Sequence, residues 1–208
     1  MSLYTKVNGA WKQALDIFTK VNNQWKRVLG IYTKINGQWK ESITRSLTGD
    51  VFIGISGRGV YTFNSENVKY KASNGNPTTS NLSSAVYANG LFVVVGNGGT
   101  ILTSPDGITW TKRKSPVIYD LINIIYANGL FVVVGNSGTI LKSPDGITWT
   151  KRASPVSYNL NNMIYANGLY VIVGNNGTIL TSTDGNTWTQ RTSGTTNSLN
   201  GIAYVNGL

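Results

Sequence analysis

The chain has 208 residues, of which 40% are hydrophobic and 24 are glycine, and its formal net charge at pH 7 is +10. It contains neither cysteine nor histidine, which excludes disulfides, thiolate chemistry and the commonest metal ligand and general base. No apolar run reaches the ~20 residues of a membrane-spanning helix, and the N-terminal "MSLYTKVNGAWK" lacks the apolar core of a signal peptide. We therefore expect no membrane insertion, no metal and no cofactor.

The first 46 residues contain one motif three times. Its tryptophan recurs at a spacing of 14 residues, as Trp11, Trp25 and Trp39. Asn8-Gly9 and Asn36-Gly37 are typical of the two-residue type I′ turn of a β-hairpin, because both turn positions need positive φ. With that turn, Val7 faces Ala10, Lys6 faces Trp11 and Tyr4 faces Gln13 in the first copy. The sequence therefore predicts three β-hairpins over residues 1–46.

One such hairpin is marginally stable in water, so three of them need a surface for their aromatic faces. One interpretation is a docking element whose aromatic side chains contact a partner. The other is a self-contained meander in which the same side chains form a core. The predicted docking residues are Tyr4, Trp11, Phe18, Trp25, Tyr32 and Trp39.

The basic charge does not indicate nucleic acid as a partner. Residues 1–46 hold eight basic and two acidic side chains, but the lysines recur singly inside the predicted strands. Nucleic-acid-binding proteins gather Lys and Arg on one face or stripe.

A second repeat begins at residue 47, with a spacing of 39 residues. Tyr-Ala-Asn-Gly occurs at 87–90, 126–129 and 165–168, and Tyr-Val-Asn-Gly occurs at 204–207. Each unit contains four short β-prone segments, such as "NIIYA", "LFVVVG", "TILTS" and "ITWTKR". Four strands in about 40 residues, repeated, are typical of a β-propeller blade. We predict an all-β chain, with hairpin repeats over 1–46 and a small, four-bladed β-propeller over 47–208.

The blade number follows from two partial copies. Segment 59–71, "GVYTFNSENVKYK", is similar to 99–111, "GTILTSPDGITWT", with Tyr70 at the place of Trp110. Residues 51–71 thus supply strands two to four of a blade, and residues 199–205 supply a first strand. We expect the two segments to pair and close the ring, which leaves no long open edge. The alternative is a longer array, of which these segments are part.

Two sets of segments resemble known families. "SPDGITW" (104–110 and 143–149) and "STDGNTW" (182–188) resemble the Asp-box of sialidase-like BNR-repeat propellers, with one residue fewer between Asp and Gly than the usual pattern. The whole unit is similar to propeller repeats of phage virion proteins and photosystem II assembly factors. The "YTKVNGAWK" copies resemble repeats at the start of predicted phage tail, collar and fibre proteins. The first resemblance implies that Asp106, Asp145 and Asp184 accept backbone donors in structural turns and that the adjacent tryptophans pack between strands.

The acidic residues do not suggest catalysis. Hydrolysis of a glycosidic bond needs two carboxylates facing it. Once the turn and hairpin residues are set aside, Asp50 and Asp120 are left. Arg113, Arg152 and Arg191 occupy equivalent positions on different repeats, so they do not form a cluster. We predict no catalytic residues and no enzyme activity.

Topology suggests where a ligand would bind. Because strands alternate in direction, the links between blades share one end of the ring with the turns between second and third strands. Aromatic faces and planar amides at that end suit sugars. Polar surface loops are also common without any ligand, so this alternative stays open. The predicted ligand face consists of Arg58, Asn97, Tyr119, Asn136, Tyr158 and Asn175.

These observations favour a non-enzymatic bacteriophage virion protein of the tail, collar or fibre, assembled in the host cytoplasm. Its hairpins would dock on other virion proteins, and its propeller would bind a host-surface glycan or protein. Assembly as a homo-oligomer is consistent with the repeated hairpins. The alternative is a soluble lectin-like or assembly-scaffold propeller without a virion role.

Overall fold

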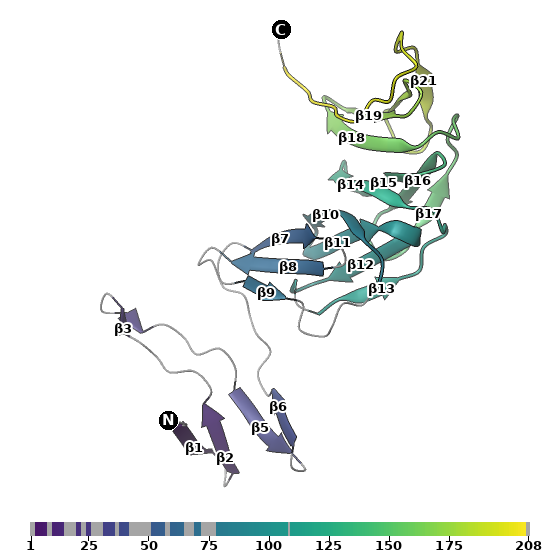
Figure 1. The fold of residues 1–208 in the computed structure, drawn as a ribbon. Helices are drawn as coiled ribbons and strands as arrows, with labels where there is room; N and C mark the ends of the chain where they lie inside the picture. Colours follow the sequence, from purple (N-terminus) through teal and green to yellow (C-terminus); the bar gives the residue numbers. More distant parts are fainter. Residues whose placement is uncertain are drawn as a thin grey trace. The chain divides into compact units, whose positions relative to one another are not determined.

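The structure is a computed structural model, and it describes residues 78–206 except residue 108, together with the backbone of the strands between residues 3 and 71. The chain divides into two compact units, Met1–Leu47 and Thr48–Leu208. Both are built from antiparallel strands, which confirms the predicted all-β class (Figure 1). In the described part of the chain, no helix has the length and apolar character needed to cross a membrane.

The first unit contains hairpins in the predicted register. Val7 pairs with Ala10, Lys6 with Trp11 and Tyr4 with Gln13. The same lysine-tryptophan pairing recurs in the other two copies, as Lys20 with Trp25 and Lys34 with Trp39. The strands are β1 (Leu3–Val7), β2 (Ala10–Ala14), β3 (Lys20–Val21), β4 (Gln24–Trp25), β5 (Ile31–Ile35) and β6 (Gln38–Glu41).

The three hairpins do not form one continuous sheet. Gln13 of β2 pairs with Tyr32 of β5, so the first and third hairpins share a four-stranded sheet of order β1-β2-β5-β6. The second hairpin is a separate two-stranded sheet. Five of the six predicted docking residues lie on these strands, and Phe18 lies outside the described residues.

The second unit contains three similar four-stranded sheets. Each uses its strands in chain order, and the first turn has the predicted positive φ, 52° at Asn89 and 72° at Gly90 in the first sheet. The second strand, "LFVVVG" in the first two sheets, is apolar on both faces because each sheet packs between neighbours. The first sheet contains β10 (Leu82–Ala88), β11 (Leu91–Gly96), β12 (Thr100–Ser104) and β13 (Thr111–Arg113), with the short 3-10 helix η1 (Asn97–Gly99) before β12. The second contains β14 (Leu121–Ala127), β15 (Leu130–Gly135), β16 (Thr139–Ser143) and β17 (Thr150–Arg152). The third contains β18 (Leu160–Ala166), β19 (Leu169–Gly174), β20 (Ile179–Ser182) and β21 (Thr189–Arg191).

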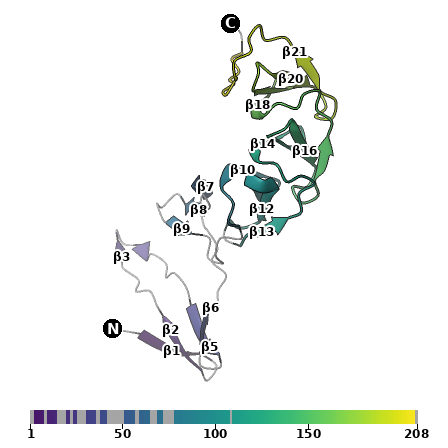
Figure 2. The ribbon, with the colours of Figure 1, turned by 45° about the vertical axis from the view of Figure 1, so that its right-hand side comes forward.

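The core of this unit lies between successive sheets. Val93 and Val95 of β11 pack with Phe131 and Val133 of β15, and all four side chains are fully buried or nearly so. Val132 and Val134 face the other way and pack with Tyr170 and Ile172 of the third sheet in the same manner. The first strands β10, β14 and β18 line one side of this row, and the short fourth strands line the other (Figures 1 and 2). This stacking is that of propeller blades.

A partial sheet precedes the three complete ones. It contains β7 (Val51–Ser56), β8 (Gly59–Asn64) and β9 (Lys69–Lys71), in that order, and β7 lies beside β10. Its third strand differs from the prediction. Tyr70 pairs with Thr62, as Lys112 pairs with Leu102, so Tyr70 takes the place of Lys112 and not that of Trp110. Four residues separate β8 from β9, whereas six separate β12 from β13.

The predicted pairing of residues 199–205 with residues 51–71 is not formed in the structure. Residues 199–205 have no strand, and β7 pairs with β8 alone among the described strands. The C-terminal segment is held instead by the third sheet, where the backbone N–H of Leu199 donates to the carbonyl of Gly174 at 3.0 Å. The partial sheet lies against the first sheet, and residues 199–205 follow the third sheet. The three complete sheets therefore lie between the two segments along the row.

Candidate ligand-binding site

The aspartate turns between third and fourth strands form one end of the sheets. In the second sheet Asp145 Oδ1 accepts the backbone N–H groups of Ile147 and Thr148, both at 2.8 Å. Ser143 Oγ donates to the same carboxylate and accepts the N–H of Gly146 at 2.8 Å. Asp106 and Asp184 make equivalent bonds in the other two sheets. These side chains therefore have the structural role that the resemblance implied.

The same bonds lower the pKa of two of these carboxylates, Asp145 and Asp184. The N–H of Thr148 contributes most to lowering the pKa of Asp145 from 3.8 to about 2, and the N–H of Thr187 contributes most to lowering the pKa of Asp184. A general acid needs a pKa near the working pH. At neutral pH these groups are thus ionised acceptors for their own turns and have no proton to donate.

The opposite end joins each sheet to the next through main-chain bonds. The backbone N–H of Gly99 donates to the carbonyl of Tyr119, Gly138 donates to Tyr158, and Gly177 donates to Asn197, each at 2.8 Å. The turns between second and third strands therefore lie against the links, as the alternating strand directions predicted.

Side chains reinforce these joints, and Asp120 is the one that sequence reasoning left without a role. Its Oδ1 accepts the N–H of Gly98 at 2.8 Å, and its Oδ2 accepts a longer bond, 3.4 Å, from Asn136 Nδ2. Asn159 occupies the equivalent position and accepts the N–H of Ser137 at 3.0 Å. The shared position of Asp120 and Asn159 in the repeat is the signal that could have identified this function.

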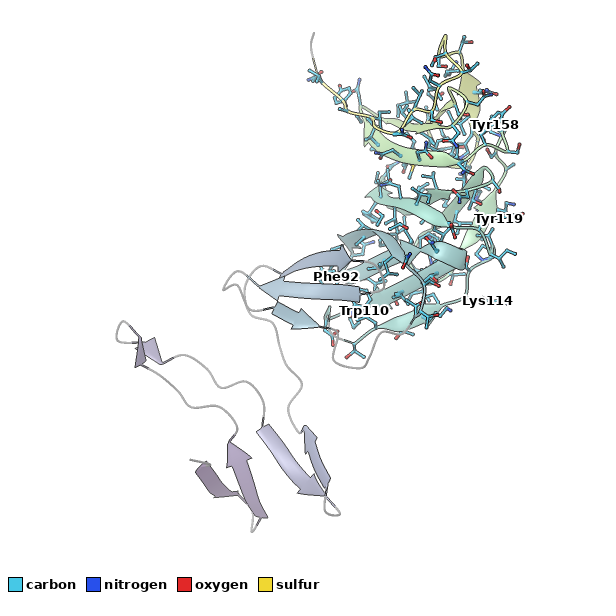
Figure 3. All side chains as sticks on the ribbon, viewed as in Figure 1. Phe92, Trp110, Lys114, Tyr119 and Tyr158 are labelled. Carbon is cyan, nitrogen blue, oxygen red and sulfur yellow. The ribbon has the colours of Figure 1, made fainter. Side chains whose placement is uncertain are left out.

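The predicted ligand-face residues that the structure describes lie at this end, but they differ in how far a ligand could contact them. Tyr119 and Tyr158 are 44% and 46% exposed and occupy successive links on the same side of the sheets (Figure 3). The asparagines at 97, 136 and 175 are half-buried. Asn136 and Asn175 are engaged by Asp120 and Asn161 respectively, so they contribute to the joints. Arg58 lies outside the described residues.

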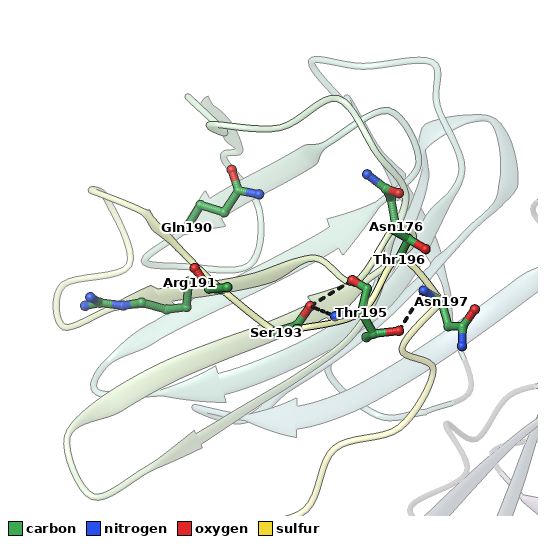
Figure 4. A pocket seen from close by; sticks show the side chains of 10 residues that line it. Asn176, Gln190, Arg191, Ser193, Thr195, Thr196 and Asn197 are labelled. Atoms are coloured by element: carbon green, nitrogen blue, oxygen red, sulfur yellow. Dashed lines mark hydrogen bonds between the residues drawn. The ribbon is translucent and has the colours of Figure 1, made fainter.

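The third repeat has a polar hollow at this end. It has a volume of about 750 Å³ and lies between the turn at Asn176 and the link that follows β21. Figure 4 shows the side chains that line it, with Ser193 Oγ bonded to the carbonyl of Thr195. The side chains lining it are Asn176, Gln190, Arg191, Thr192, Ser193, Thr195, Thr196 and Asn197.

The hollow coincides with a departure from the repeat. The second link reads Ser-Pro-Val-Ser-Tyr, whereas the third reads Ser-Gly-Thr-Thr-Asn, so three apolar or aromatic residues are replaced by small or polar ones. Gly194 has φ +74°, a conformation that proline at the equivalent position 155 could not adopt. The sequence alone shows this difference between the links, but only the fold shows that the third link lines a hollow.

The arrangement offers hydroxyls, amides and one guanidinium. Arg191 Nε donates to Thr181 Oγ1 at 2.9 Å, which orients the side chain along the sheet. Among the described residues, no three His, Cys, Asp or Glu side chains come together as metal ligands. The side chains at this site offer hydrogen-bond donors and acceptors together with the positive charge of Arg191.

No family model and no curated protein match the chain. Solved structures similar to it include the computationally designed Ika8 protein, with a TM-score of 0.54, 11% identity, and coverage of 98% of this chain and 64% of Ika8. Virginiamycin B lyase from Staphylococcus aureus has a TM-score of 0.57 and 15% identity, over 78% of this chain and 62% of the lyase. YCF48 from Cyanidioschyzon merolae has a TM-score of 0.51 and 14% identity, over 95% of this chain and 83% of YCF48.

This chain therefore spans less than two thirds of the length of Ika8 and of the lyase. At such identities the likeness establishes the fold alone. The fold is all-β, with N-terminal hairpin repeats followed by a small β-propeller.

Proposed function

We propose that the chain is a non-enzymatic structural protein of a bacteriophage virion, a tail, collar or fibre component that docks through its hairpins. The observation that carries this proposal is a separate N-terminal unit in which a lysine pairs with a tryptophan in each of three hairpins. Repeated aromatic anchors multiply weak contacts through effective concentration. The neighbouring lysines would favour an acidic partner surface and make docking sensitive to salt.

The absence of enzyme activity is part of the same proposal. Solved structures of similar fold include enzymes, so the fold does not decide the question. The aspartates of the three turns support a non-enzyme, because their carboxylates accept backbone N–H groups of their own turns.

The propeller would then bind a host-surface glycan or protein. The polar hollow of the third repeat supports a glycan, because hydroxyl and amide groups pair with sugar hydroxyls. The same hollow would serve a lectin-like propeller without a virion role, so docking and ligand binding need separate tests.

Docking is tested by incorporation into phage particles. We expect mass spectrometry of purified particles to find the wild-type protein, and the triple variant Trp11→Ala, Trp25→Ala, Trp39→Ala to be missing while its propeller keeps its melting temperature. Gln24→Ala with Gln38→Ala is the matched control, since these residues precede two of the tryptophans, and it should incorporate normally. Equal incorporation of the triple variant would contradict docking by the hairpins.

Ligand binding is tested with a glycan array and a panel of glycosides. We expect Asn176→Ala with Asn197→Ala to lose glycan binding, and Thr187→Ala, at the opposite end of the third sheet, to retain it. Binding by wild type without any place in a particle would favour the lectin-like alternative. Turnover of any glycoside would contradict the proposed absence of catalysis.

A further inference from the structure

The charged side chains of residues 78–206 occupy separate parts of the three complete sheets. The first and second strands of these sheets contain no charged residue. The acidic residues lie in turns and in a link, and those of the turns accept N–H groups of their own turns. The basic residues lie on third and fourth strands or directly after one, and they are Lys112, Arg113, Lys114, Lys142, Lys151, Arg152 and Arg191. The side of the row that the fourth strands form, here called the outer side, is therefore basic (Figures 1 and 2).

The register brings a cation from each of two sheets to the contact between them. Arg113 pairs with Ile101, which is part of the buried cluster between the first and second sheets, and Arg113 Nε donates to Thr103 Oγ1 on the same face. Lys151 pairs with Leu141, which belongs to the same cluster. Directly paired side chains share a face of their sheet. Arg113 of the first sheet and Lys151 of the second therefore face the same contact, at its outer side.

The contact between the second and third sheets also has two cations. Arg152 pairs with Ile140, which is buried in the cluster between these sheets, and Lys142 lies on the same face two residues after Ile140. Arg152 Nη2 donates to Thr150 Oγ1 at 3.1 Å, and Lys142 Nζ donates to Asn186 Oδ1 at 2.8 Å. Like charges at one contact repel each other, and neither a hydroxyl nor an amide carries a charge that offsets them. Each contact therefore favours an anion.

An exposed tyrosine belongs to the link at each of these contacts. Tyr119 precedes the second sheet and Tyr158 precedes the third, and their side chains are 44% and 46% exposed. Both lie with Lys114 along one side of the row (Figure 3). Their carbonyl groups accept the N–H groups of Gly99 and Gly138, so the backbone that carries each ring is held by the preceding sheet. Aromatic faces and cations thus recur together at successive sheets.

The third repeat lacks two of these features at once. Gln190 stands at the place of Lys151, and Asn197 stands at the place of Tyr158. The first two repeats have both the lysine and the tyrosine. Within this chain the two residues are kept together or lost together, which is expected if they contact the same ligand.

We propose, on the basis of the proposed binding of a host-surface glycan, that this glycan is a linear acidic polysaccharide bound along the outer side. Its sugar rings would stack on Tyr119 and Tyr158, because a tyrosine offers an apolar face with a polar end. Its carboxylate, sulfate or phosphate groups would pair with the arginines and lysines of the two contacts. A polymer with regularly spaced acid groups is favoured because the contacts recur with the repeat, and several weak contacts to one polymer add through effective concentration. A neutral glycan would leave the cations at the contacts without a counter-charge.

Polymers that differ in charge test this choice of glycan. Dextran and dextran sulfate of equal length are the probes, and polygalacturonate supplies carboxylates in place of sulfates. We expect the immobilised full-length protein to bind both acidic polymers, with an affinity that falls as salt is added, and to bind dextran at least about tenfold more weakly. Equal affinity for dextran and dextran sulfate, or no binding of either acidic polymer, would overturn the inference. The proposed glycan binding would still stand if the glycan array shows a ligand that Asn176→Ala with Asn197→Ala loses, and it would fail too if the array shows none.

Residues of the third repeat provide variants that the fold already accommodates. Lys142→Thr with Lys151→Gln removes one cation from each contact, and the third sheet has threonine and glutamine at these places. The affinity for dextran sulfate should fall about tenfold, which is the effect of two exposed charge pairs. Lys12→Gln with Lys40→Gln, on β2 and β6 of the first unit, removes the same charge and is the matched control. An equal fall in the control would show that net charge determines binding and would refute a site on the outer side.

The tyrosines are tested with the same probe. Tyr119→Asn with Tyr158→Asn introduces the residue that the third link has at this place, where the main-chain bond is also 2.8 Å. This variant should bind dextran sulfate about tenfold more weakly, whereas Tyr119→Phe with Tyr158→Phe keeps the rings and should bind as wild type. Loss in both variants, or in neither, would contradict stacking on the rings. Tighter binding of single-stranded DNA than of the acidic polysaccharides would also overturn the proposal, because nucleic acids combine charge with stacking in the same way.

Discussion

The carboxylate of Asp120 accepts a hydrogen bond from the backbone N–H of Gly98 at 2.8 Å and thereby ties the link before the second sheet to the turn of the first. Asp120→Ala should lower the free energy of unfolding by about 1 kcal/mol, because the N–H loses a charged acceptor at a site open to water. Asp120→Asn should cost less, since Asn159 makes the same contact with an amide. Thermal unfolding of both variants is the measurement. If both variants lose the same stability, the hydrogen bond to Gly98 does not explain the loss in the alanine variant.

Lys142 stands where the first and third sheets have a threonine, Thr103 and Thr181. Arg113 Nε and Arg191 Nε donate to threonines at 2.8 and 2.9 Å, but Lys142 replaces that threonine in the second sheet and Arg152 Nε is buried without an acceptor. Lys142→Thr should stabilise the protein by roughly 0.5–1.5 kcal/mol by supplying the acceptor, although the bond from Lys142 Nζ to Asn186 is lost. Denaturant unfolding measures this change. The reverse change in the third sheet, Thr181→Lys, should destabilise, and a gain there would contradict the explanation.

Gly135 is required by a close approach of two backbones. A Cβ at this position would overlap the carbonyl oxygen of Asp120. Because this oxygen belongs to the backbone, it cannot move away as the end of a flexible side chain could. Gly135→Ala should destabilise by about 1–3 kcal/mol or more. Gly201→Ala is the control, because its Cβ would meet open space, and its melting temperature should stay near that of wild type. Similar melting temperatures for the two variants would disprove the steric reason.

The aspartate turns predict a pH dependence with a definite sign. A carboxylate whose pKa is lower in the folded than in the unfolded protein stabilises the fold above its ordinary pKa, and this stabilisation is lost as the pH falls. For Asp145 the loss should occur between about pH 4 and pH 2, given its pKa of about 2. Asp145→Asn should melt below wild type at pH 7, and the two curves should converge near pH 2. The difference should be small, because the group is exposed and screened by solvent. A constant difference across this range would contradict the linkage.

Much of the fold could be predicted because local chemistry determines it. Asn-Gly turns fix the register of Lys6 with Trp11, and a repeat of four strands gives the sheets their order. The pairing of β2 with β5 could not be predicted, because three nearly identical hairpins offer equivalent edges. The repeat marks positions 120 and 159 as equivalent, but which N–H group their side chains reach depends on how one sheet packs on the next. Tyr70 likewise lies two positions from its expected place, because four residues separate β8 from β9 and six separate β12 from β13.

The main-chain bonds from Gly99, Gly138 and Gly177 to the links have a consequence for how the sequence can diverge. A carbonyl accepts a hydrogen bond whatever side chain it carries, so the residues at 119, 158 and 197 can change without loosening the joint. This chain already has tyrosine at the first two positions and asparagine at the third, with the same bond of 2.8 Å. Successive copies can therefore acquire different surfaces while the architecture is inherited unchanged, which makes the links the positions where new binding specificities can evolve at least cost to folding.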